Sequence, residues 1–149
     1  MSVRFPGQHR RVLIDTSVWI YHFEQHPELG PPAGRVIESL EAGKFRGVAS
    51  ELTLLELTVR PLQLGRQDVA DDYEVLLDNF PNLELEPVSR EILLEAAVLR
   101  ARHRLRTPDA IQIATGLGTG ATLAVTNDEA WRGIRFIETL ILSDLVESE

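Results

Sequence analysis

The stretch Val12-Leu13-Ile14-Asp15-Thr16-Ser17 constrains the fold more than any other part of the 149-residue chain. Three apolar residues stand together and are followed at once by a carboxylate and two hydroxyls. A short unbroken apolar run is typical of a strand buried on both faces, as in a parallel sheet. Ligands of such sheets bind just beyond the carboxyl ends of the strands. The stretch therefore predicts a central strand with Asp15 at the edge where ligands collect.

The rest of the chain alternates segments of strand and helix character. Short apolar or alternating runs predict further strands at 45–49, 83–86, 122–125 and 135–137. Helical spacing, caps and breakers predict helices at 16–25, 33–42, 51–59, 67–80, 90–105 and 108–115. This alternation predicts an α/β fold of three layers, with a twisted, largely parallel sheet of four to five strands flanked by helices.

We expect a single domain over residues 1–149, because this length suffices for one substantial core. The core should span about 11–137, with a loose lead-in at 1–9 and a C-terminal tail at 139–149. No stretch approaches the roughly 18 apolar residues of a membrane span, and the first residues lack the apolar core of a signal peptide. We therefore expect a cytoplasmic protein that does not bind membranes.

Composition narrows the function classes further. The chain has no cysteine, so disulfide and thiolate chemistry are excluded. A net charge of −8 argues against broad electrostatic binding to nucleic acid. It is compatible with a nucleic-acid enzyme whose acids bind metal ions, because a bound cation inverts the local charge.

Three aspartates occupy positions where carboxylates can meet. Asp15 follows the first predicted strand, and Asp128 closely follows the strand at 122–125. The carboxyl ends of parallel strands lie at one edge of a sheet, so these two acids should lie near each other. Asp109 is the second residue of the helix that starts at Pro108, where free N–H groups and the helix dipole favour an ionised acid.

Glu56 is the fourth candidate acid. On a helical wheel it lies among Leu52, Leu55 and Val59, beside what we predict to be the core-facing stripe of its helix. A lone charge there would be costly, which favours a functional role. Glu51, five residues earlier, lies on the opposite side of the helix and is the weaker candidate.

Four carboxylates that converge on one point repel one another unless they bind a cation. Oxygen ligands without His or Cys suit a hard divalent ion such as Mg²⁺ or Mn²⁺. An ion held by few carboxylates, which keeps several waters, is typical of phosphoryl chemistry: it activates and orients a water and neutralises charge on a phosphodiester.

Four segments together resemble the motifs of PIN-domain proteins, and most of all the VapC-type toxins of toxin–antitoxin pairs. The likeness runs in order from Arg11 to Ile137, and the first and third motifs are the more specific. The segments are Leu13 to Ile20, Ser50 to Glu56, Arg106 to Ala110, and Val125 to Asp128.

The resemblance implies a Mg²⁺- or Mn²⁺-dependent endoribonuclease that hydrolyses RNA phosphodiesters with a metal-activated water. It also implies frequent homodimers and inhibition by a cognate antitoxin. By matched position, Asp15 and Asp109 are the strongest metal ligands, and Glu56 and Asp128 complete the catalytic site. The supporting residues are Thr16, Ser17, Thr126 and Asn127.

Each of these acids also has a purely structural interpretation. Asp15 could be a helix N-cap, Asp109 a favourable first-turn charge, and Asp128 a turn residue. Glu56 could be a surface acid. The ordered set of four favours the metal site over these separate explanations.

A basic run precedes Asp109, and it contains Arg100, Arg102, Arg104 and Arg106. Placed next to a metal site, these arginines could contact RNA phosphates. The alternative is a solvated helix face with favourable cations near its C-terminus.

Other function classes fit less well. A phosphoacceptor receiver domain needs a lysine late in the chain, but Lys44 is the only lysine. A phosphatase of the haloacid dehalogenase type needs a second Asp two residues after the first, where this chain has Ser17. A non-catalytic PIN-like binding or regulatory module would be expected to lack part of the acidic quartet, and all four acids are present.

Overall fold

The computed structural model describes residues 5–146, in which five strands form one parallel sheet. The strand order is β3-β2-β1-β4-β5, so the strand that ends before Asp15 is the central one. All four neighbouring pairs are parallel, which confirms the predicted α/β class. The strands are β1 (Arg11–Ile14), β2 (Arg46–Ser50), β3 (Leu83–Glu86), β4 (Leu123–Thr126) and β5 (Glu138–Ile141).

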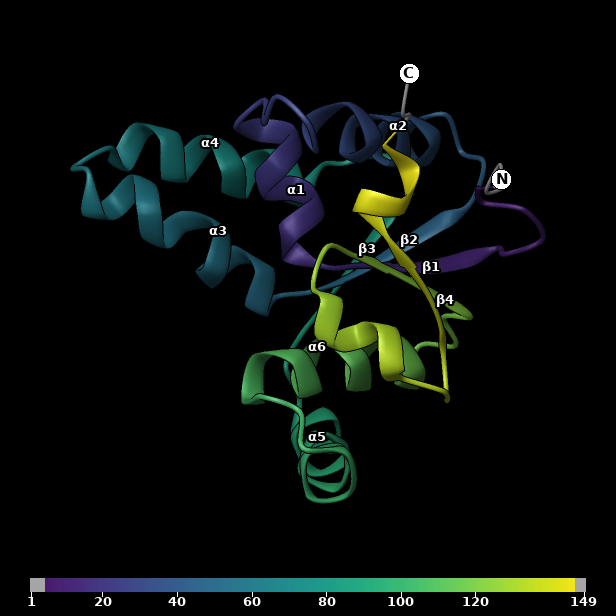
Figure 1. The fold of residues 1–149 in the computed structure, drawn as a ribbon. Coiled ribbons are helices and arrows are strands. Elements are labelled where there is room, and N and C mark those ends of the chain that lie inside the picture. Colours follow the sequence, from purple (N-terminus) through teal and green to yellow (C-terminus); the bar gives the residue numbers. More distant parts are fainter. Residues whose placement is uncertain (1–4, 147–149) are drawn as a thin grey trace.

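Helices cover both faces of this sheet, as Figure 1 shows. The first four lie on one side, where α3 and α4 form a hairpin that projects beyond the sheet, and α5 and α6 lie on the other. The helices are α1 (Thr16–Phe23), α2 (Gly30–Glu41), α3 (Leu52–Gln63), α4 (Gln67–Asp78), α5 (Arg90–His103) and α6 (Thr107–Gly118). Two short 3₁₀ helices follow, η1 (Glu129–Gly133) and η2 (Leu142–Leu145). No helix within residues 5–146 has the length and apolar character needed to cross a membrane.

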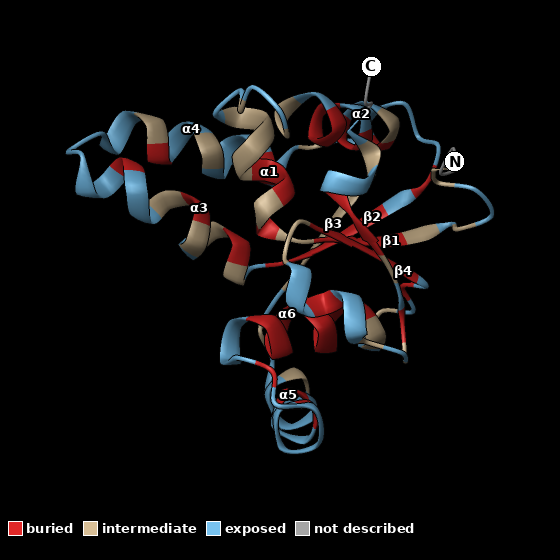
Figure 2. Cartoon of the chain, viewed as in Figure 1, coloured by how far each residue is buried: buried red, intermediate tan, exposed pale blue. Residues whose placement is uncertain are grey.

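The central strand is buried on both faces, as the apolar run predicts. Val12, Leu13 and Ile14 are each 0% exposed. Val12 and Ile14 pack in the cluster under α1 and α2, whereas Leu13 packs in the cluster under α5 and α6. Figure 2 shows the middle of the sheet, where β1, β2 and β4 run side by side, coloured largely as buried. This packing fixes the backbone at the point where Asp15 begins.

Two details of the N-terminal half differ from the prediction. Helix α2 begins at Gly30, with Pro31 and Pro32 in its first turn, because proline at these positions loses no helical hydrogen bond. Helix α3 continues through Pro61 to Gln63.

The prediction of a fifth strand at 135–137, followed by a tail from 139, is wrong in its position. Strand β5 lies at Glu138–Ile141 and pairs with β4 from Leu123 to Thr126. Ile137 instead packs with Trp131 in the cluster under α5 and α6. The apolar start of the predicted tail is therefore an edge strand, and only 147–149 of it lie outside the described residues.

Candidate active site

Asp15 stands where β1 ends and α1 begins, but its side chain does not cap the helix. Its Oδ2 atom accepts hydrogen bonds from Ser17 Oγ at 2.9 Å and from Thr126 Oγ1 at 2.7 Å. The N-cap interpretation is therefore wrong for this side chain. The two hydroxyls orient the carboxylate from α1 and from the end of β4.

The same hydroxyls tie the end of β4 to the start of α1. Ser17 Oγ also accepts from the backbone N–H of Asn127 at 3.1 Å, and Thr126 Oγ1 accepts from the N–H of Asp128 at 3.0 Å. The Asn127 side chain instead contacts η2, where its Oδ1 accepts a hydrogen bond from the N–H of Ser143. Asn127 thus supports the site through its backbone, while its amide anchors η2.

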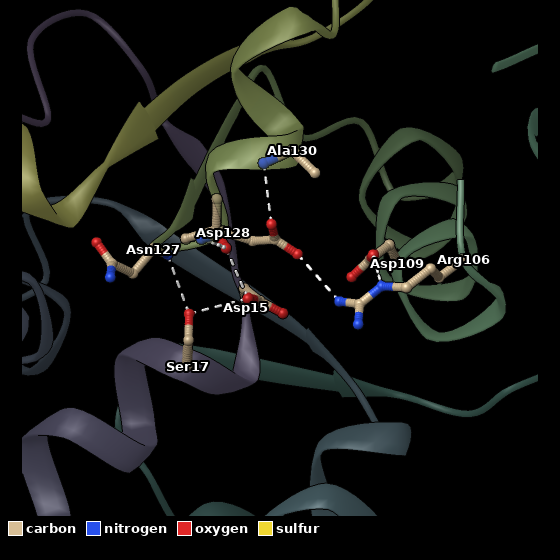
Figure 3. Close-up of polar contacts among 8 residues, drawn as sticks. Asp15, Ser17, Arg106, Asp109, Asn127, Asp128 and Ala130 are labelled. Atoms are coloured by element: carbon tan, nitrogen blue, oxygen red, sulfur yellow. Dashed lines mark hydrogen bonds and ion pairs between the residues drawn. The ribbon is translucent and has the colours of Figure 1, made fainter. Parts of the chain in front are cut away.

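Asp109 and Asp128 both form ion pairs with the guanidinium of Arg106. Arg106 donates from Nε to Asp109 Oδ2 at 3.0 Å and from a terminal nitrogen to Asp128 Oδ2 at 3.1 Å (Figure 3). Asp109 is a buried residue in the first turn of α6. Asp128 also caps η1, because its Oδ1 accepts from the N–H of Ala130 at 2.9 Å. The predicted turn role of Asp128 is confirmed, and it coexists with a contact to the acidic cluster.

Glu56 reaches the site through Thr16. Thr16 Oγ1 lies 2.9 Å from Glu56 Oε1 and 2.9 Å from Thr53 Oγ1. The helical-wheel argument for Glu56 is wrong in its details, because Leu55 is 60% exposed and Val59 is 41% exposed. Leucines surround this helix over a wide arc, so the sequence did not reveal which face meets the core.

Sequence reasoning missed Gln112. This residue lies one helical turn after Asp109 on α6 and is 1% exposed. Its Nε2 donates toward Thr16 Oγ1 and Thr53 Oγ1, each at 3.1 Å, and toward Glu56 Oε1 at 3.3 Å. The i+3 spacing from Asp109 was the signal that could have identified it.

Hydrogen bonds and ion pairs join three of the acids. Asp15 is linked through Thr126 to Asp128, and Arg106 links Asp128 to Asp109. Glu56 belongs to a second hydrogen-bonded set, which adjoins the first because its member Thr16 follows Asp15 in the chain. Among residues 5–146, however, no three His, Asp or Glu side chains stand close enough to form a ready-made metal cluster. The acids are neighbours bridged by donors.

Electrostatics at Asp15 favour a neighbouring cation. Burial of its carboxyl group raises the pKa from 3.8 to about 6. The hydrogen bonds from Thr126 and Ser17 lower this pKa, whereas the charges of Glu56 and Asp109 raise it again. A positive ion would offset both the burial cost and the repulsion.

The donor chemistry of the network fits a hard divalent cation. The acids offer carboxylate oxygens, their neighbours are hydroxyls, one amide and the Arg106 guanidinium, and neither His nor Cys takes part. The candidate ligands are Asp15, Glu56, Asp109 and Asp128.

The four arginines of the basic run have different surroundings. Arg100 donates to the carbonyl of Leu105 at 2.9 Å and thereby holds the α5–α6 connection. Arg102 lies exposed in the last turn of α5, and Arg104 ends that helix in a left-handed conformation with φ of 55°. Arg106 is the one that contacts the acids of the site.

Fold and network together define an α/β protein with an acidic site at the carboxyl edge of a parallel sheet. A profile of the PIN domain matches residues 12–137, so the chain belongs to the PIN domain family. This confirms the family predicted from the four motifs. Among curated protein sequences, none matches the chain.

Solved structures with the same fold include several toxin–antitoxin proteins. VapBC2 from Rickettsia felis, bound to a promoter DNA fragment, has a TM-score of 0.69 and 16% identity, covering 88% of this chain and 98% of that one. A toxin–antitoxin complex from Klebsiella pneumoniae has a TM-score of 0.67 and 21% identity, covering 88% and 97%. VapC20 from Mycobacterium tuberculosis, a toxin that cleaves the sarcin–ricin loop, has a TM-score of 0.60 and 21% identity, covering 76% and 86%.

Proposed function

We propose that this PIN-domain protein is a Mg²⁺- or Mn²⁺-dependent endoribonuclease and the toxin of a type II toxin–antitoxin pair. The observation that carries the proposal is that hydrogen bonds and ion pairs join Asp15, Asp109 and Asp128 at one edge of the sheet, while Thr16, the residue after Asp15, holds Glu56 beside them. A purely structural role for four separate acids gives no reason for such a connection.

The side chains around the acids have a positioning role. Ser17 and Thr126 hold the Asp15 carboxylate in one orientation, and Thr16 and Gln112 do the same for Glu56. These donors are neutral, so they orient the carboxylate oxygens without neutralising them. The negative charge remains available to bind a cation. When bound, the divalent ion supplies an activated water and neutralises negative charge on the phosphodiester.

Similar proteins support RNA as the substrate and an antitoxin as the partner. VapC20 is a toxin that cleaves the sarcin–ricin loop, and the Klebsiella pneumoniae structure is a toxin–antitoxin complex, so RNA and an antitoxin are the partners that we propose here. Arg106 contacts the acids of the site, and Arg102 and Arg104 are exposed shortly before it in the chain, so all three are candidate contacts for RNA phosphates. Arg100 is the weakest of these candidates because its guanidinium already binds a backbone carbonyl. We further propose that the protein is a cytoplasmic homodimer.

The decisive experiment compares Mn²⁺-dependent cleavage of RNA by the purified protein and by two variants, Asp15→Asn and Asp109→Asn. Each should lose cleavage by at least about 100-fold, as expected when a ligand of an essential ion is removed. Asp72→Asn is the matched control, because Asp72 lies exposed on α4 and takes no part in the network.

Retention of wild-type cleavage in either site variant would contradict the proposal. So would a wild-type protein that binds RNA without cleaving it in Mn²⁺, since that behaviour belongs to the non-catalytic binding module. Loss of cleavage in the Asp72 variant would show that the assay reports on folding.

A further inference from the structure

Arg106 holds a position that a divalent cation also needs. It is the residue just before α6, and its guanidinium spans the gap between Asp109 on α6 and Asp128 after β4. Figure 3 shows the fork of the guanidinium aimed between these two carboxylates. The contacts are 3.0 Å and 3.1 Å, and both use the Oδ2 atom of the acid.

The two kinds of cation compete for these oxygens. A guanidinium keeps its charge at every pH that a folded protein tolerates, so Arg106 cannot release the acids by losing a proton. An ion that binds Asp109 and Asp128 must therefore displace Arg106 or share its partners at a cost in repulsion.

The surroundings of Arg106 allow displacement. Its side chain is 74% exposed, against 11% for Asp109 and 27% for Asp128. The acids are thus held by the protein, while the arginine is the movable partner with water on its outer side. Its side chain also makes no cap for α6, so moving it does not uncap the helix.

We propose that Arg106 is a tethered counter-cation, which offsets part of the negative charge of Asp109 and Asp128 in the metal-free protein and lowers the affinity of the site for its divalent ion. This inference rests on the proposed metal-dependent function, because it assumes that these acids bind the ion. Arg106 thereby sets the metal concentration at which the site fills.

Direct measurement of Mn²⁺ binding by titration calorimetry tests this role without reference to cleavage. The variant Arg106→Gln should bind Mn²⁺ about 3- to 10-fold more tightly than the wild type, because it lacks the two exposed ion pairs that compete with the metal. Arg90→Gln is the control for charge alone, since Arg90 is an exposed arginine on α5 that pairs with neither Asp109 nor Asp128 and is not a candidate RNA contact. Its affinity should stay within about 2-fold of the wild type at physiological salt.

The outcomes separate the two proposals. Arg106→Gln with the affinity of the control, or a weaker one, overturns the counter-cation role while the metal site stands. If neither the wild type nor any variant binds Mn²⁺, both the metal-dependent function and the counter-cation role are overturned. Arg106→Lys provides a second check, because it keeps the charge and loses the two-armed fork, and its affinity should lie between those of the wild type and Arg106→Gln.

Discussion

Replacing Asp15 by asparagine should stabilise the protein when no divalent metal ion is present, and the gain should grow with pH. Asp15 carries a raised pKa of about 6, chiefly because burial penalises its ionised form. Asparagine has nearly the same shape and can still accept the hydrogen bonds of Ser17 and Thr126. It cannot ionise, so it avoids the penalty.

The sign follows from the direction of the shift. A carboxyl group whose pKa is higher in the folded protein than in the unfolded chain stabilises the fold while it is protonated. This contribution is fully present only at pH values below the unfolded pKa. That contribution is lost as the pH rises from about 4 through about 6, because the folded state then has to hold a charge that the unfolded chain holds more easily.

The magnitude follows from the two pKa values, 3.8 and about 6. Ionisation of Asp15 should cost the folded state about 3 kcal/mol at pH 7, and only about 0.5 kcal/mol near pH 4. The stability difference between Asp15→Asn and the wild type should therefore increase by about 2 kcal/mol between those two conditions. Any pH-independent effect of the amide cancels in this comparison.

Urea unfolding in the presence of EDTA, at about pH 4 and at pH 7, measures the difference directly. Both conditions lie away from the isoelectric point of about 5.0, where proteins associate. The matched control is Asp72→Asn, whose exposed site should keep the stability change within about 0.5 kcal/mol at both pH values. A stability difference for Asp15→Asn that does not change with pH would refute the electrostatic reasoning.

Three further predictions test the metal, the positioning residue and the core. Saturating Mn²⁺ at about 100 times its dissociation constant should stabilise the wild type by about 2.7 kcal/mol in thermal unfolding, and EDTA should reverse this gain; an equal gain in Asp15→Asn would contradict the ligand assignment. Gln112→Leu should weaken Mn²⁺ binding in calorimetry, and unchanged binding would exclude a role in holding Glu56. The same substitution should change the free energy of unfolding by less than about 1.5 kcal/mol, because the lost hydrogen bonds are offset by removal of a buried Oε1 that has no partner. Leu13→Ala should destabilise the fully buried central strand by about 2–5 kcal/mol in urea, and a loss below about 1 kcal/mol would contradict its place in the core.

The sequence predicted the central strand and the neighbourhood of the acids because both depend on short-range patterns. An unbroken apolar run can be buried on both faces only inside a sheet, and the carboxyl ends of parallel strands necessarily share an edge. Asp15 and Asp128 lie near each other for this reason, linked through Thr126. Predicting their proximity requires no knowledge of the intervening helices.

The fifth strand and the inner face of α3 depend on long-range packing, and there the sequence misled. The segment 135–137 contains two large apolar residues, but they pack with Trp131 and other residues under α5 and α6, so the strand forms three residues later. On α3, leucines occupy too many directions for a wheel to choose one, and Leu55 and Val59 proved exposed. Gln112 was overlooked because its i+3 spacing from Asp109 gains meaning only once its partners on α1 and α3 are known.

The charges of the site are balanced differently in its two halves. Asp15 and Glu56 receive hydrogen bonds from neutral groups, which orient their oxygens and leave the net charge in place. Asp109 and Asp128 are partly neutralised by Arg106, whose single charge they share. A divalent ion therefore meets no competing cation at the first pair, but at the second it must displace one. The resting protein avoids the full repulsion of four carboxylates, and the affinity for metal is set at the half that the exposed arginine controls.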